Sequence, residues 1–155
     1  MVRDGGVEPA SELRGLVQQL FRRFGVLAAD RTPCGNPLPI AQAHTLMLLL
    51  ESQPLTQQAL AAALHIDKSN VARLCSKLSA AGHIEQQVGD DARQRLVRLT
   101  PSGRRLAKQV ERASQQRFQE ILRNMPPHTR EQLLPVLQDL VRSIELLPSP
   151  SEPES

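Results

Sequence analysis

The sequence predicts a mainly α-helical protein with one small β-hairpin, an α+β fold in which helices dominate. Apolar residues recur at helical spacing through most of the 155 residues. One stretch, residues 84–99, instead contains two short runs of strand character around a turn-forming loop. The length suits one domain, or one domain with a dimerisation arm.

The first predicted helix lies within residues 11–30 and carries a broad apolar stripe. The stripe consists of Leu13, Leu16, Val17, Leu20, Phe21, Phe24 and Leu27. We expect this helix to end before the Pro- and Gly-containing loop at residues 31–39. Residues 40–51 are so apolar that the helix they form should be buried on nearly all sides.

Residues 55–82 predict two helices joined by a tight turn. Thr56 and Asp67 are suited to cap them, because a side-chain oxygen can accept hydrogen bonds from the free N–H groups at a helix start. The second helix is amphipathic, and Gly82 is suited to end it. Its inward face consists of Val71, Leu74, Cys75 and Leu78, and its outward face of Ser69, Asn70, Arg73 and Lys77.

The hairpin is predicted from strands at residues 84–88 and 95–99, with Val97 and Leu99 on the face that covers the helices. Its tip carries Asp91, Arg93 and Arg95. A helix-turn-helix followed by such a wing is a winged helix, which we assign to residues 38–100.

The polar side chains of this unit suit double-stranded DNA. Arginine can bind guanine in a bidentate manner and asparagine can bind adenine, while serine and lysine can hold phosphates. A wing arginine can reach the minor groove or a phosphate. The predicted DNA-binding residues are Ser69, Asn70, Arg73, Lys77, Asp91, Arg93 and Arg95.

Two more helices are predicted within residues 101–147. Thr100 and Pro101 open the first, which carries Leu106, Val110, Ala113, Phe118, Ile121 and Met125 on its inward side and ends at Pro126. A Thr129–Gln132 capping box opens the second, in which Leu133, Leu137, Leu140, Ile144 and Leu147 form nearly a heptad repeat. Residues 148–155 read as a disordered tail.

The apolar stripes of the terminal helices, residues 11–30 and 101–147, have no obvious partner within so small a winged helix. A second copy of the chain would bury them, which predicts a homodimer. Such a dimer would read a pseudo-palindromic site with half-sites about one helical turn apart. In the alternative, the terminal helices fold back on their own winged helix as a monomer.

Charge and composition favour a polyanionic partner. The net charge is +3 and the pI about 9.4. Basic residues concentrate in or beside the winged helix, namely Arg73, Lys77, Arg93, Arg95, Arg98, Arg104 and Arg105. A solvated charged surface is the alternative. The chain shows no apolar signal region and no membrane-length apolar run, so we expect a cytoplasmic protein that does not enter the membrane.

Other functional classes have little support in the sequence. It has no HExxH, Walker or GxSxG motif and no paired-cysteine ligand motif, so neither an enzyme nor a cofactor is predicted. Cys75 is expected in the core and Cys34 in a loop, with no disulfide between them. Redox sensing through Cys34 and metal sensing through His44 remain alternatives within the same fold.

Two motifs, D-x-R at Asp91–Ala92–Arg93 and L-V-R-L-T-x-x-G at residues 96–103, resemble the MarR family of bacterial transcription regulators. In element order the resemblance spans residues 13–144. It implies dimerisation through the first and last helices. It also implies that the wing Asp91 and Arg93 pair with each other and that Arg93 enters the minor groove. Ala92 departs from the basic residue that many relatives have there.

The resemblance further implies a ligand-responsive repressor. In the family, small phenolic or other amphipathic molecules occupy a cleft where the dimerisation helices meet the winged helix. The corresponding residues here are Phe21, Phe24, His44, Met47 and Leu48, for which a plain core role is the alternative. The rival function is a winged-helix module for protein–protein contacts without DNA affinity.

Overall fold

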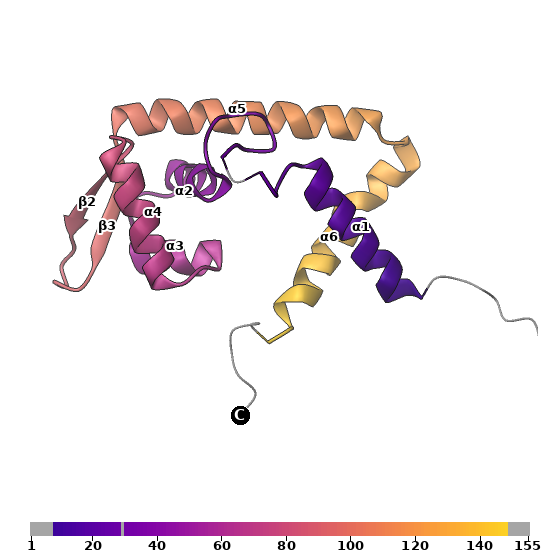
Figure 1. Cartoon of the computed structure of the whole chain (residues 1–155), viewed down its shortest axis with the longest axis horizontal. Helices are drawn as coiled ribbons and strands as arrows, with labels where there is room; N and C mark the ends of the chain where they lie inside the picture. The colour runs from indigo at the N-terminus through magenta and orange to yellow at the C-terminus, as the bar shows by residue number, and fades with distance from the viewer. Residues whose placement is uncertain (1–7, 29, 149–155) are drawn as a thin grey trace, which may run out of the picture. The chain divides into compact units, whose positions relative to one another are not determined.

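The computed structural model describes residues 8–28 and 30–148, so most of the predicted tail lies outside the described residues. The chain divides into two compact units, Met1–Gln115 and Gln116–Ser155. The elements are α1 (Pro9–Arg23), α2 (Ile40–Glu51), β1 (Leu55–Thr56), α3 (Gln57–Leu64), α4 (Lys68–Ala80), β2 (Ile84–Val88), β3 (Arg95–Leu99), α5 (Pro101–Asn124) and α6 (Pro127–Glu145) (Figure 1). The predicted fold class is confirmed: the protein is mostly helical with a small antiparallel sheet.

The sheet contains three strands in the order β1-β3-β2, one more than predicted. β2 and β3 form the predicted hairpin, in which Ile84 pairs with Leu99. β1 pairs with the other edge of β3 through Leu55 and Val97. A two-residue strand leaves no alternating pattern in the sequence, and its partner lies about 40 residues later, so only the folded chain brings the two together.

The core of the first unit lies between the helix-turn-helix and the sheet. The inward face predicted for α4 is confirmed, because all four of its residues are buried. They pack in one cluster with residues of α2, α3 and the sheet, including Leu46, Leu49, Leu60 and Val97. In Figure 1 the β2–β3 hairpin extends beside α4, as expected of a wing.

The ends of α3 and α4 follow the sequence expectation. The Thr56 hydroxyl accepts a hydrogen bond from the Ala59 N–H at 3.0 Å, and the Asp67 carboxylate accepts one from the Asn70 N–H at 2.8 Å. These bonds satisfy backbone donors that a helix start leaves free. Gly82, with φ of 77°, lies just after the C-cap residue Ala81 of α4, in the left-handed conformation that glycine adopts without strain.

Three sequence expectations about the helices are wrong. α1 ends at Arg23, so Leu27 lies outside it, because Gly25 with φ of 69° turns the chain away. α2 is not buried on nearly all sides, since His44 is exposed and Met47 is half-buried. α6 begins at Pro127 with no side-chain cap, instead of at a Thr129–Gln132 capping box. The fixed φ of proline suits the first helical position and accounts for the earlier start.

Thr100 opens α5 as predicted, because its hydroxyl accepts a hydrogen bond from the Gly103 N–H at 3.0 Å. Here α5 passes close to the residue that precedes β2. A Cβ placed on Gly103 would lie 1.8 Å from the His83 carbonyl oxygen. This approach, which the sequence did not predict, makes glycine the residue that fits at position 103.

The terminal helices expose apolar side chains. Neither α1 nor α6 has a buried residue. On α6, Leu134, Leu137, Val141 and Ile144 are 41–61% exposed. Phe118 of α5, predicted to face inward, is 52% exposed in the single chain.

Burial of Cys75 raises the pKa of its thiol from 9.0 to about 11, because the apolar surroundings disfavour the thiolate. The native state therefore keeps the proton at a pH where the unfolded chain has lost it. The resulting contribution to stability is complete below pH 9 and is lost as the pH rises towards 11. A shift of this size corresponds to about 3 kcal/mol.

We expect the free energy of unfolding to fall more steeply between pH 9 and 11 in the wild type than in Cys75→Ala. Urea denaturation of both proteins at several pH values measures this difference, and the variant corrects for lysine titration. Parallel pH profiles would contradict the prediction.

Candidate nucleic-acid interface

The outward face of α4 presents the four polar residues predicted from the sequence. Ser69, Asn70, Arg73 and Lys77 are all exposed. At about 100° per residue, they lie within roughly 100° of the helix circumference. Ser76 is exposed on the same face but was not predicted as a site residue. Its spacing of seven residues from Ser69 and three from Arg73 would have placed it on that face. The face offers both hydrogen-bond donors and positive charge.

Hydrogen bonds within the wing order its tip. The Gly89 N–H donates to the Gln94 carbonyl at 3.0 Å, and the Gln94 N–H donates to the Asp91 carbonyl at 2.9 Å. The Asp91 carboxylate accepts from the backbone N–H of Arg93 at 3.0 Å. Asp91 thus contacts Arg93 through the backbone N–H of Arg93. The side chains of Arg93 and Arg95 are exposed.

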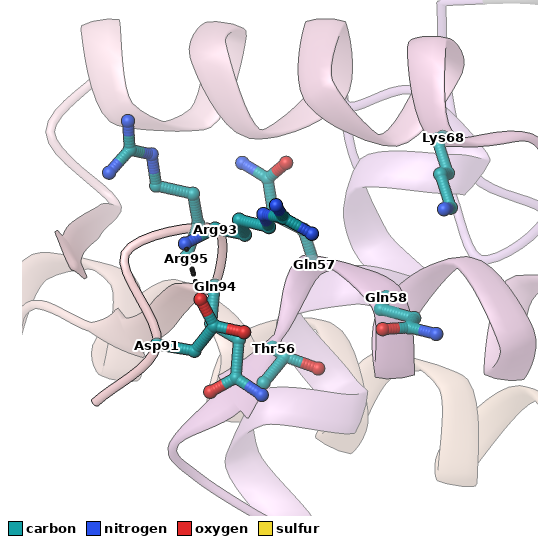
Figure 2. A pocket seen from close by; sticks show the side chains of 8 residues that line it. All are labelled: Thr56, Gln57, Gln58, Lys68, Asp91, Arg93, Gln94 and Arg95. Carbon is teal, nitrogen blue, oxygen red and sulfur yellow. Dashed lines mark hydrogen bonds between the residues drawn. The ribbon is translucent and has the colours of Figure 1, made fainter. Parts of the chain in front are cut away.

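The wing and the starts of α3 and α4 enclose a polar groove of about 350 Å³. Figure 2 shows the wing residues Asp91, Arg93 and Arg95 along one part of it and Gln58 and Lys68 along another. Thr56, Gln57 and Gln94 complete the lining. Three cationic side chains therefore line one groove, a pattern that suits an anionic backbone.

Of the residues around this groove, Thr56, Gln57, Gln58, Lys68 and Gln94 were not predicted as site residues. The Gln57 side-chain amide donates to the side-chain amide oxygen of Gln86, on β2, at 2.5 Å and joins α3 to the sheet. Pairing of β1 with β3 also holds the start of α3 next to the wing. No local pattern in the sequence signals either of these long-range contacts.

A second groove, of about 450 Å³, runs along the other side of the α4 face. Asn70, Arg73 and Lys77 line it together with Ile66 and with residues at the start of α2, which are Pro39, Ala41 and Gln42. Three of the four predicted α4 residues therefore line this second groove, whereas α4 contributes only Lys68 to the first.

The residues predicted to bind a small ligand lie in two places. His44, Met47 and Leu48 line a shallow groove of about 290 Å³. Glu51 of α2 and Ala63 and Leu64 of α3 complete its lining. Phe21 lies on α1 with half of its surface exposed, and Phe24 follows the last residue of α1. Neither phenylalanine is among the residues that line this groove.

Within residues 8–28 and 30–148, no group of three or more His, Cys, Asp and Glu side chains is arranged to hold a metal ion. Cys34 contacts Thr32 and Asn36 in the loop before α2, with its sulfur 3.1 Å from the Thr32 hydroxyl oxygen. In the same described ranges, none of the helices combines the length and the apolar character needed to cross a membrane.

Sequence comparison relates the centre of the chain to known regulators. The model of the MarR family matches residues 36–95, from the loop before α2 to the first residue of β3. An uncharacterised HTH-type transcriptional regulator of Bacillus subtilis, YhjH, is 27% identical over 100 residues. The match covers 64% of this chain and 57% of that protein's length.

Structural comparison extends the similarity to nearly the whole chain. The S. aureus MepR–DNA complex matches with a TM-score of 0.70 and 22% identity, over 90% of this chain and 99% of MepR. Streptococcus pneumoniae FabT in complex with DNA matches with a TM-score of 0.76 and 17% identity, over 88% of this chain and 97% of FabT. A probable transcriptional regulator from Pseudomonas aeruginosa matches with a TM-score of 0.67 and 26% identity, over 81% of this chain and 93% of that protein.

Proposed function

We propose that the chain is a member of the MarR family, whose model matches residues 36–95, and that it is a DNA-binding transcriptional regulator that acts as a homodimeric repressor. The observation that carries the proposal is the exposed polar face of α4 beside a groove lined by Lys68, Arg93 and Arg95. The face can enter a major groove, and the cations can contact the adjacent phosphates. The S. aureus and S. pneumoniae neighbours are described as complexes with DNA, which supports the same partner here.

Each residue has a specific role in this proposal. Arg73 reads a base edge, Ser69 and Lys77 hold phosphates or base edges, and Arg93 and Arg95 contact the minor groove or its phosphates. Asp91 orders the wing by accepting from the Arg93 backbone. Such a protein binds DNA without catalysis, so we propose that it is not an enzyme, and that it acts in the cytoplasm.

The exposed apolar stripes of the terminal helices support the homodimer. Leu16 and Leu20 of α1 and Leu137 and Val141 of α6 are 41–54% exposed, so each helix has apolar surface left to bury. A twofold dimer presents two recognition helices, and its operator is a pseudo-palindrome.

Regulation by a small amphipathic or phenolic ligand is part of the proposal. The groove lined by His44, Met47 and Leu48 offers a half-buried apolar wall and a polar edge at which to seek such a ligand. A coupling of about 1–3 kcal/mol between ligand and DNA would weaken operator binding about 5- to 150-fold.

Two arginine substitutions test the mode of DNA binding. The probe is a duplex selected from a randomised pool with the wild-type protein. Arg73→Ala is expected to cost about 1–3 kcal/mol and to relax the preference at one base pair of each half-site. Arg93→Ala is expected to weaken binding to all duplexes and to lower the slope of log affinity against log salt by about 1. Gel-shift titrations at several salt concentrations measure both effects.

Arg142→Ala is the matched control, because it also removes one positive charge. Arg142 lies on α6, is 68% exposed and pairs with Asp139 at 3.7 Å. Such a surface pair contributes little to stability. If Arg73→Ala and Arg93→Ala bind like this control, the docking mode is wrong. If no duplex is selected, or if binding does not weaken with salt, the rival function in protein–protein contacts is favoured.

A further inference from the structure

Three side chains on the exposed face of α4 form a chain of hydrogen bonds that starts at its N-cap. The Asp67 carboxylate accepts from the Asn70 backbone N–H at 2.8 Å through one oxygen, and from the Asn70 side-chain amide at 2.7 Å through the other. The Asn70 amide oxygen in turn accepts from the Arg73 guanidinium. The spacing of three residues places the three side chains one after another along the helix.

The chemistry of the two outer groups fixes the orientation of the Asn70 amide. An ionised carboxylate only accepts hydrogen bonds, and a guanidinium only donates them. The amide therefore satisfies both neighbours only with its NH2 group towards Asp67 and its oxygen towards Arg73. The Asp67 carboxylate is thus linked to the Arg73 guanidinium through the neutral amide of Asn70.

A held arginine has an advantage over a free one in DNA recognition. An arginine side chain loses rotamer freedom when it docks on a base, and that loss opposes binding. A guanidinium has five N–H donors, so a bond to Asn70 leaves enough donors for the two acceptors of guanine. In the free protein, both Asn70 groups needed for bidentate contact with adenine already have partners within the helix.

We propose that Asp67 and Asn70 hold Arg73 in position to read a guanine, so that Asn70 is a positioning residue and does not itself read an adenine. This inference rests on the proposed DNA-binding function. It assigns one base-pair preference of the half-site to three residues that act together.

Asp67→Asn is the sharpest test, because asparagine caps a helix about as well as aspartate. With its oxygen on the Asn70 backbone N–H, the new side chain turns its NH2 group towards the Asn70 amide. That amide must then rotate to accept, which places its own NH2 group against the Arg73 guanidinium. Because the Asn70 NH2 group and the Arg73 guanidinium are then both donors, their hydrogen bond is lost and Arg73 is released. The helix keeps its N-cap.

The experiment measures the affinity of each variant for the selected duplex and for duplexes changed at single base pairs. We expect Arg73→Ala to reduce discrimination at one base pair by about 5- to 150-fold. Asp67→Asn and Asn70→Ala should reduce discrimination at that same base pair, and neither should have a further effect there in the Arg73→Ala background. Circular dichroism should show unchanged helix content.

Two results would overturn the inference. In one, Asn70→Ala relaxes a base pair different from that of Arg73→Ala, so that Asn70 reads its own base. In the other, Asp67→Asn leaves discrimination unchanged at the Arg73 base pair. A wild-type protein that selects no duplex would instead refute the proposed function itself, which distinguishes the two failures.

Discussion

Leu137→Glu is expected to convert the protein from a dimer to a monomer and to lower its affinity for the selected duplex by about 100-fold or more. Leu137 lies among the exposed apolar side chains of α6 and is itself 41% exposed. A carboxylate there would have to be buried without a partner in the dimer, which is costly. A monomer loses the second half-site, and linking two binding modules raises affinity about 10²- to 10⁴-fold.

The measurements are analytical ultracentrifugation for the mass and a gel shift for the DNA affinity. Gln132→Glu is the matched control, since it adds the same charge to α6 away from the apolar stripe at an exposed position. The control should remain dimeric and bind DNA like the wild type. A dimeric Leu137→Glu protein of full affinity would show that this face of α6 is not the dimer interface.

Gly103→Ala is expected to lower the free energy of unfolding by about 3 kcal/mol or more. The added methyl group would lie 1.8 Å from the His83 carbonyl oxygen and 2.7 Å from its carbonyl carbon. Both atoms belong to the backbone, so no side-chain rotation relieves the overlap. The His83 carbonyl also accepts from the Thr100 N–H at 3.1 Å, so a shift of the chain here weakens the junction between the wing and α5.

Urea denaturation at a fixed protein concentration measures this change, because the stability of a dimer depends on concentration. Gly15→Ala is the control: Gly15 lies in α1, and a Cβ there would have no neighbour within 4 Å. Alanine in place of a helical glycine should leave stability unchanged or raise it by about 0.5–1 kcal/mol. Equal midpoints for Gly103→Ala and the wild type would show that the junction accommodates a side chain.

Sequence patterns predicted the elements whose determinants are local. Asp67, the apolar spacing of α4 and Gly82 lie within one segment, and the observed helix begins and ends where they indicate. The strands β2 and β3 also match their predicted bounds, because a single turn-forming loop connects them. Local signals competed at Pro127 and Thr129, and the structure begins α6 at the proline.

Only the parts of the candidate site that have local determinants were predicted from the sequence. The outward face of α4 follows from helical periodicity, and the wing arginines follow from their place in a hairpin. The groove beside them also contains Gln57 and Gln58, which come from the start of α3. Their place next to the wing depends on the pairing of Leu55 with Val97, which no short stretch of sequence reveals.

The sequence alone determined a mainly helical protein with a winged helix-turn-helix, the polar face of α4 and the apolar stripes of the terminal helices. These features depend on periodicity, capping and turn chemistry, which act over a few residues. Only the tertiary structure decided the third strand, the contact of Gly103 with His83 and the orientation of Asn70 between Asp67 and Arg73. The first two depend on the approach of distant segments and the third on side-chain rotamers, none of which residue order specifies.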